Sequence, residues 1–192
     1  KKYAKELKEI SKKYEDKIFI VMRTYFEKPR TNIGWKGLIN DPNMDQSFDI
    51  KQGLEQARHL LLQILDIGLP TASEMLDPIV PQYIADLVSW ASLGARTTES
   101  QPHREMASGL SMPIGFKNAT NGDVSIAINA MEAARHSHSF IGTNQEGNIA
   151  QVTTQGNPHG HLILRGGSNG PNYEESHIIK NSEILKKRNL PH

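Results

Sequence analysis

Short apolar runs alternate with longer amphipathic segments along this chain, and that alternation constrains the fold more than any other feature. Ile18–Met22 is a continuous apolar run of the kind found in strands buried on both faces. The segment after Asp49 repeats apolar residues on one helical face and stops at Gly68 and Pro70, which predicts a helix capped by Asp49. Strands that alternate with helices indicate a parallel sheet covered by helices, either doubly wound or a (β/α)8 barrel.

The same reasoning places the other elements of the chain. In residues 1–16 the apolar positions Tyr3, Leu7, Ile10 and Tyr14 recur with helical spacing. An antiparallel hairpin is expected over residues 139–153, with its turn at 145–147. Further strands are expected at 71–76, 88–95, 113–116 and 162–164, and further helices at 81–87, 101–109, 123–134 and 174–187. Five core strands in 192 residues fall short of a complete barrel, which has eight strands and about 250 residues. We therefore expect a single α/β domain over residues 1–192 that forms part of such a barrel.

Composition excludes several classes of protein. The formal net charge is +1, which argues against a large basic surface for nucleic acid. The absence of cysteine excludes a disulfide scaffold, thiolate catalysis and Cys-ligated metal in this chain. No apolar run approaches the roughly 20 residues of a membrane span, and no apolar segment of a signal peptide follows the Lys-rich start. We expect a cytoplasmic protein without nucleic-acid or membrane partners.

Each predicted core strand is followed by a charged residue at its carboxyl end: Arg23, Glu74, Arg96, Lys117 and Arg165. Parallel α/β proteins build their sites at that end. Four cations around one site suit a small substrate that carries a phosphate and a carboxylate, because guanidinium groups bind both in a bidentate manner. The alternative is that each cation simply begins a solvated loop.

The loop after the first strand offers a second set of anion-binding groups. Lys28, Arg30 and Thr31 surround Pro29, which fixes the turn, and together they predict a second phosphate-binding loop. An ordinary charged surface loop is the alternative. Two His-x-His pairs, at 136–138 and 159–161, precede predicted strands and therefore lie at the opposite end of the sheet, so we do not expect them to bind metal.

Several long motifs in this chain resemble one enzyme family, the type I 3-deoxy-D-arabino-heptulosonate 7-phosphate (DAHP) synthases. These motifs are the run from Val21 through Thr31 to Pro42, Gly94–Ser100, Gly115–Asn118 and Ile163–Gly167. The resemblance implies a (β/α)8 barrel with an inserted regulatory β-hairpin, which corresponds to residues 139–153. This chain would supply about strands two to six of it. It also implies condensation of phosphoenolpyruvate with erythrose 4-phosphate and release of phosphate, the first step of the shikimate pathway to the aromatic amino acids.

The resemblance implies roles for individual residues. The phosphoenolpyruvate site would consist of Arg23, Glu74, Gly94, Ala95, Arg96, Lys117 and Arg165. Lys117 and Arg165 are the expected catalytic residues, with Lys117 a candidate proton donor. The erythrose 4-phosphate site would consist of Lys28, Pro29, Arg30 and Thr31.

The resemblance also implies a divalent metal, Mn, Fe, Co or Zn, in the parent enzyme. Its ligands in the family are a Cys, a His, a Glu and an Asp that this chain does not match. We therefore expect that this chain as given binds no catalytic metal and is inactive alone. The parent is expected to be a homo-oligomer, either a dimer or a tetramer.

Enzymes of this family are inhibited by an aromatic amino acid, and the hairpin here resembles that of the tyrosine-regulated isoforms. Gly142 would leave room for a tyrosine hydroxyl; the alternative is that it merely relieves crowding in the hairpin. The matching regulatory positions are Pro81, Gln82, Leu110, Ser111, Phe140, Gly142 and Val152. Two alternatives remain for the function: a 3-deoxy-octulosonate 8-phosphate synthase-like enzyme, and a non-catalytic fragment that binds small anions or an aromatic amino acid.

Overall fold

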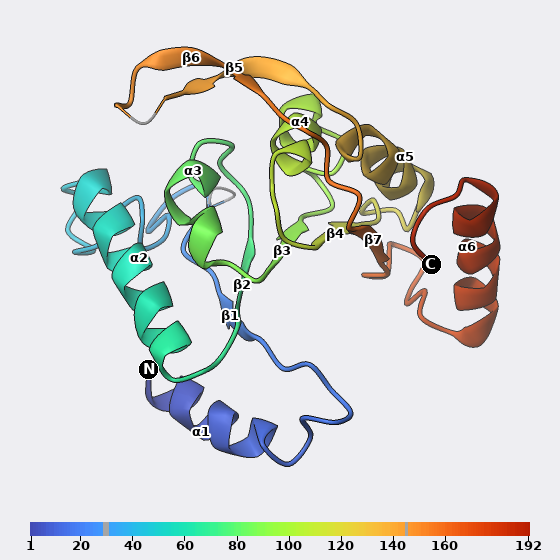
Figure 1. Ribbon diagram of the computed structural model, residues 1–192, viewed down its shortest axis with the longest axis horizontal. Coiled ribbons are helices and arrows are strands. Elements are labelled where there is room, and N and C mark those ends of the chain that lie inside the picture. The colour runs from blue at the N-terminus through green and yellow to red at the C-terminus, as the bar shows by residue number, and fades with distance from the viewer. Residues whose placement is uncertain (29–30, 145) are drawn as a thin grey trace. The chain divides into compact units, whose positions relative to one another are not determined.

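A computed structural model describes residues 1–28, 31–144 and 146–192 of the chain (Figure 1). The chain forms two compact units, and each is described by itself. The first comprises Lys1–Glu74 and Val80–Trp90, and the second comprises Met75–Ile79 and Ala91–His192. In both units the secondary structure is mixed α/β.

The first unit contains two parallel strands and their helices. Its elements are α1 (Lys2–Ser11), β1 (Met22–Thr24), α2 (Ile50–Asp66), β2 (Thr71–Glu74), α3 (Pro81–Ile84) and the 3-10 helix η1 (Ala85–Leu87). β1 pairs with β2 in parallel, with Arg23 opposite Ala72. The predicted cap is confirmed, because the Asp49 side chain accepts a hydrogen bond from the Gln52 backbone N–H.

The expected strand at 18–22 is wrong in its position. The strand begins at Met22, whose backbone N–H donates to Pro70 O, while Ile18 and Phe19 are 57% and 75% exposed. A run of apolar residues predicts that a segment favours a strand. Which of its residues form the strand depends on which of them pair with the neighbouring strand.

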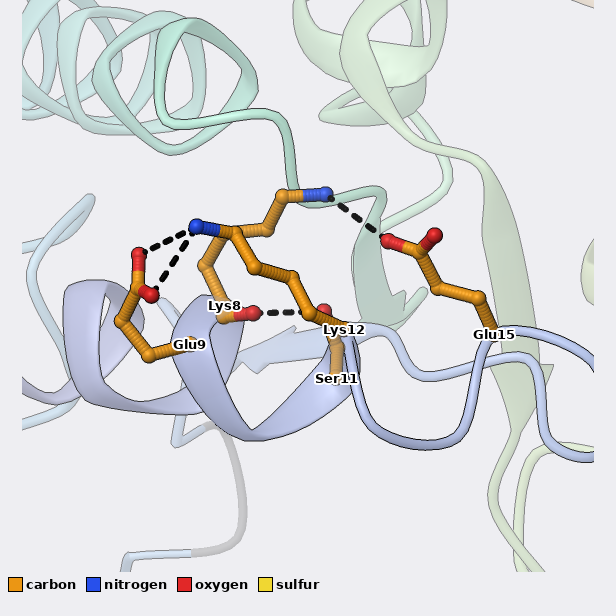
Figure 2. A network of polar contacts seen from close by, with 5 residues as sticks. All are labelled: Lys8, Glu9, Ser11, Lys12 and Glu15. Carbon is orange, nitrogen blue, oxygen red and sulfur yellow. Dashed lines mark hydrogen bonds and ion pairs between the residues drawn. The ribbon is translucent and has the colours of Figure 1, made fainter.

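The buried face of α1 also differs from the expected one. Ala4 is fully buried against Ile64 and Leu69, with Leu7 packed beside them, whereas Tyr3 and Ile10 are exposed. Figure 2 shows ion pairs on the polar surface of α1, where Lys12 contacts Glu9 and Lys8 faces Glu15. Exposed pairs of this kind contribute little. The apolar contacts of Ala4 and Leu7 therefore hold the helix in place.

The second unit contains three parallel strands, a separate hairpin and three helices. Its elements are β3 (Trp90–Leu93, which starts at the unit boundary), α4 (Gln101–Ser108), β4 (Ile114–Lys117), α5 (Ser125–Ala134), β5 (Ser139–Thr143), β6 (Ile149–Thr153), β7 (Gly160–Ile163) and α6 (Glu175–Lys187). β4 lies between β3 and β7 and pairs with both in parallel. The expected hairpin is present, since β5 and β6 pair antiparallel with Phe140 opposite Val152.

Phe116 of β4 is fully buried and is one of the largest fully buried side chains of the protein. Close packing around it depends on small residues in the neighbouring strand. A Cβ on Gly160 would lie 3.1 Å from the Phe116 ring and 3.6 Å from Met131 of α5. A larger residue at position 160 would press against the Phe116 ring, which would have to shift by a few tenths of an ångström.

The parallel strands confirm the expected α/β class. The described residues do not include a closed barrel. Among these residues, no helix combines the length and apolar composition that crossing a membrane requires.

Candidate active site

The carboxyl ends of β3, β4 and β7 lie along one edge of the second unit. Leu93 is opposite Phe116 in the ladder, and Lys117 is opposite Ile163. Arg96 lies three residues beyond the end of β3, and Arg165 two residues beyond the end of β7. Because parallel strands end at the same edge, the register places all three cations at that edge.

A compact turn after β3 positions Arg96. Gly94 O accepts hydrogen bonds from the backbone N–H groups of Thr97 and Thr98 at 3.0 and 2.9 Å, and from both threonine hydroxyls at the same distances. Arg104 of α4 donates its Nε–H to Thr98 O at 2.9 Å. The turn is thus fixed from within and from α4, while the Arg96 side chain is exposed.

Asn118 fixes the turn that carries Arg165. Its side-chain oxygen accepts from the Arg165 backbone N–H at 2.9 Å, and its amide nitrogen donates to Gly166 O at 3.0 Å. Asn172 completes the arrangement by donating to Asn118 Oδ1 at 3.1 Å and accepting from the Gly166 N–H at 2.8 Å. Both asparagines are buried, so these hydrogen bonds are sheltered from water.

Two glycines let this turn pack against its neighbour. Gly166 has a φ of +77°, in the left-handed region that glycine adopts without strain. A Cβ on Gly167 would lie 2.4 Å from Gly122 N, which is closer than real Cβ atoms come. Gly167 therefore packs directly against the turn at residues 121–122, with no room for a side chain.

The first unit holds the predicted substrate-binding residues Arg23, Lys28, Thr31 and Glu74. The Arg23 guanidinium lies 5.0 Å from the Tyr25 ring centre, and the Lys28 ammonium lies 5.5 Å from the Trp35 ring centre. Thr31 donates its backbone N–H to Lys28 O at 3.1 Å, and Glu74 is 8% exposed at the end of β2. The predictions for Pro29 and Arg30 lie outside the described residues.

The predicted phosphoenolpyruvate site draws residues from both units, and each group is described within its own unit. Arg96, Lys117 and Arg165 share one edge of the second unit, and Gly94 and Ala95 belong to the turn before Arg96. Arg23 and Glu74 end the two strands of the first unit. The roles assigned to all of these residues stay predictions.

Leu110 and Ser111, two of the predicted regulatory residues, follow α4, and the base of the hairpin is bonded to this helix. The Ser108 and Thr154 hydroxyls are 2.6 Å apart, and Thr154 Oγ1 also accepts from the His138 N–H at 2.9 Å. Phe140, Gly142 and Val152 belong to the hairpin itself. Pro81 and Gln82 lie in the first unit, at the start of α3.

Sequence reasoning missed a pocket beside the Arg165 turn. It has a volume of about 280 Å³, and its lining includes Gly122, Gly167, Asn172, Lys180 and Asn181. None of the three cations at the strand ends lines it. The Asn-Gly pair at 121–122 and the glycines at 166–167 were the available sequence signals, because both mark turns where backbone lies close to backbone.

The metal implied by the family resemblance does not fit the residues seen here. In the described part of the chain no three His, Cys, Asp or Glu side chains gather to hold a metal ion. His161 is in β7 rather than before it, and burial lowers its pKa, so its imidazole is neutral at pH 7.

Together these features define an α/β protein with cations at the carboxyl edge of parallel strands. The chain belongs to the DAHP synthetase I family, whose model matches residues 1–192. It is 56% identical over 188 residues to "Phospho-2-dehydro-3-deoxyheptonate aldolase, Tyr-sensitive" of Salmonella typhimurium, covering 98% of this chain and 52% of the relative. It is also 56% identical over 191 residues to "Phospho-2-dehydro-3-deoxyheptonate aldolase, Phe-sensitive" of Escherichia coli K12. That match covers 100% of this chain and 54% of the relative.

A solved structure shows the same fold. The phospho-2-dehydro-3-deoxyheptonate aldolase of Francisella tularensis matches with a TM-score of 0.94 and 53% identity, over 98% of this chain and 55% of that one. The chain therefore spans about half the length of the relatives that it matches.

Proposed function

We propose that the protein carrying this chain is a DAHP synthase. It condenses phosphoenolpyruvate with erythrose 4-phosphate and releases inorganic phosphate. The observation that carries this proposal is the edge formed by Arg96, Lys117 and Arg165, which the family motifs supply and the parallel register aligns. The five parallel-paired strands would correspond to strands two to six of a (β/α)8 barrel.

The chemistry explains why cations are needed. C3 of phosphoenolpyruvate attacks the aldehyde carbon of erythrose 4-phosphate and forms the new C–C bond. Water adds at C2. The bond between C2 and the bridging oxygen of the phosphate group then breaks, and phosphate leaves with the bonding electrons.

In our proposal Arg96, Lys117 and Arg165, with Arg23, bind the phosphate and carboxylate, and Lys117 donates a proton. Glu74, Gly94 and Ala95 complete the binding site. Catalysis would then rest on orientation and charge stabilisation.

We assign the second substrate to the loop after β1. Lys28 and Thr31, with Pro29 and Arg30, would bind the phosphate of erythrose 4-phosphate. The ammonium of Lys28 over the Trp35 ring supports this assignment, because the ring limits the positions that the cation adopts.

Regulation and assembly are part of the same proposal. We propose tyrosine as the inhibitor, bound by Pro81, Gln82, Leu110, Ser111, Phe140, Gly142 and Val152. Relatives named Tyr-, Trp- and Phe-sensitive match at 56%, 55% and 56% identity, so identity alone does not select among them. We further propose a cytoplasmic homo-oligomer that uses a divalent metal, with metal ligands from outside the residues described.

The test is a sugar-specificity assay of the native protein that contains this sequence. Phosphate release from phosphoenolpyruvate is measured with erythrose 4-phosphate and with arabinose 5-phosphate, with manganese present. The proposal expects turnover with the four-carbon sugar. Turnover only with arabinose 5-phosphate would support the octulosonate enzyme instead, and no turnover with either would support a non-catalytic protein.

A further inference from the structure

Asp41 is a buried carboxylate with an oxygen that has no partner. The residue is 4% exposed, and its Oδ1 makes no hydrogen bond. The other oxygen, Oδ2, accepts from the Gln46 backbone N–H at 3.3 Å. Among the described residues no cation forms an ion pair with Asp41. A buried carboxylate oxygen without a partner costs folding free energy, and a bound ligand at this oxygen would remove that cost.

The sequence around Asp41 has the spacing of a calcium-binding loop. Such loops read D-x-[DN]-x-[DN]-G and supply oxygen atoms from alternate positions. Here the series is Asp41, Asn43 and Asp45, and Gln46 takes the place of the glycine. Gln46 has a φ of +65°, so it adopts the left-handed conformation that the glycine of such a loop supplies.

The side chains of this series are held by hydrogen bonds to the loop backbone and to α2. The hydrogen bond from the Gln46 backbone N–H holds the Asp41 carboxylate against the loop that follows it. Asp45 Oδ1 accepts a hydrogen bond from the Ser47 backbone N–H at 2.9 Å. Asn43 donates its amide nitrogen to Gln52 Oε1 at 2.9 Å, which leaves the amide oxygen at the opposite end of the group for other contacts.

The loop leads into a helix as calcium loops do. Asp49, nine positions into the series, caps α2 by accepting from the Gln52 N–H at 3.0 Å. Position 12 is Gln52, where a calcium loop has a bidentate glutamate, so one strong ligand is missing. Two carboxylates and one amide offer an all-oxygen set of side-chain donors, which suits a hard cation with flexible geometry.

We propose that the loop Asp41–Ser47 binds a calcium ion. Asp41 Oδ1, Asn43 Oδ1 and the Asp45 carboxylate are the side-chain ligands, and water completes the shell. The missing glutamate predicts weak binding, with a Kd of about 10⁻⁴ to 10⁻³ M. This site is independent of the proposed synthase activity and uses none of its residues.

Terbium luminescence tests the proposal on the native protein that contains this sequence, because Trp35 lies beside the loop and can sensitise the emission. The indole Nε1–H donates to Asp41 O at 2.6 Å, so an ion in the loop lies near the ring. Excitation of tryptophan should give terbium emission that calcium displaces. Asp45→Asn and Asp41→Asn should each weaken terbium affinity at least tenfold, whereas Asp66→Asn, at an exposed position of α2, should not change it.

Two outcomes would overturn the proposal. One is the absence of calcium-displaceable emission from the folded chain. The other is equal terbium affinity in the Asp45→Asn variant and the parent chain. Asp45 is exposed, so its substitution leaves folding intact and the test holds even if the Asp41 variant does not fold.

Discussion

The side-chain oxygen of Asn118 accepts a hydrogen bond at 2.9 Å from the backbone N–H of Arg165, a residue 47 positions further along the chain. This bond connects the end of β4 to the turn after β7. Asn118 thereby fixes the backbone from which a proposed substrate-binding guanidinium extends. It acts through Arg165 and is a positioning residue.

Replacing Asn118 with alanine should destabilise the second unit and displace the Arg165 turn. The Arg165 N–H and the Asn172 amide would lose a buried acceptor, which costs about 1–3 kcal/mol. Urea unfolding measures the loss. Asn148→Ala, at an exposed position of the hairpin, is the control and should change stability by less than about 0.5 kcal/mol. Equal midpoints for the two variants would contradict this role.

Replacing Gly167 with alanine should be more damaging than the same change at Gly147. A Cβ at 167 would meet the backbone of residues 121–122 within 2.4–2.6 Å, and backbone atoms cannot move aside cheaply. At Gly147 no atom lies within 4 Å of the added Cβ, so the cost is only that of a φ of +81°, about 1–2 kcal/mol. Thermal unfolding of both variants compares them, and a smaller loss at 167 would refute the close packing.

Breaking the Arg58–Asp86 ion pair should cost little. The two guanidinium nitrogens lie 2.7 and 2.9 Å from the carboxylate oxygens, but the side chains are 39% and 59% exposed. Hydrogen bonds from Arg58 lower the pKa of Asp86 in the folded state. The contribution is therefore present above the unfolded pKa of about 4 and is lost as the pH falls through the lower folded value. Asp86→Asn should cost less than about 1 kcal/mol at pH 7 and still less at the lowest pH. A large effect that is independent of pH would contradict this account.

His161 should make the fold sensitive to mild acid. Burial lowers its pKa in the folded state, so below about pH 6.5 the unfolded chain takes up a proton that the folded chain resists. Stability should fall as the pH drops from 6.5 towards the lower folded pKa. His161→Gln should remove part of this dependence, whereas His59→Gln on the exposed surface of α2 should retain it. Urea midpoints between pH 7 and pH 5 make the comparison, and identical pH profiles for the two variants would contradict it.

The fold was predictable where local signals and packing agree. The Asp49 cap, the apolar face of α2 and the two paired strands of the hairpin depend on residues close in sequence, and each appears as expected. The start of β1 was not predictable, because its pairing with Thr71 is a contact between distant segments. Similarly, the face of α1 that is buried depends on Ile64 and Leu69.

The candidate site was predictable only in its charges. The sequence shows that cations follow the apolar runs. Because parallel strands end at one edge of a sheet, these cations were expected to lie at the same edge. The role of Asn118 could not, because its partner Asn172 is 54 positions away and neither amide has a local pattern. The unpartnered oxygen of Asp41 likewise becomes visible only when the loop is folded.

Phosphoenolpyruvate binding by native protein is the most direct test of the central claim that the strand-end cations form an anion site. Calorimetric titration would compare the parent protein with Arg165→Ala and with Lys187→Ala, a cation at the end of α6. Losing a charge-assisted contact of about 1.5–3 kcal/mol should weaken binding by roughly 10- to 100-fold in the first variant and leave the second unchanged. Equal affinity in all three proteins would contradict the account.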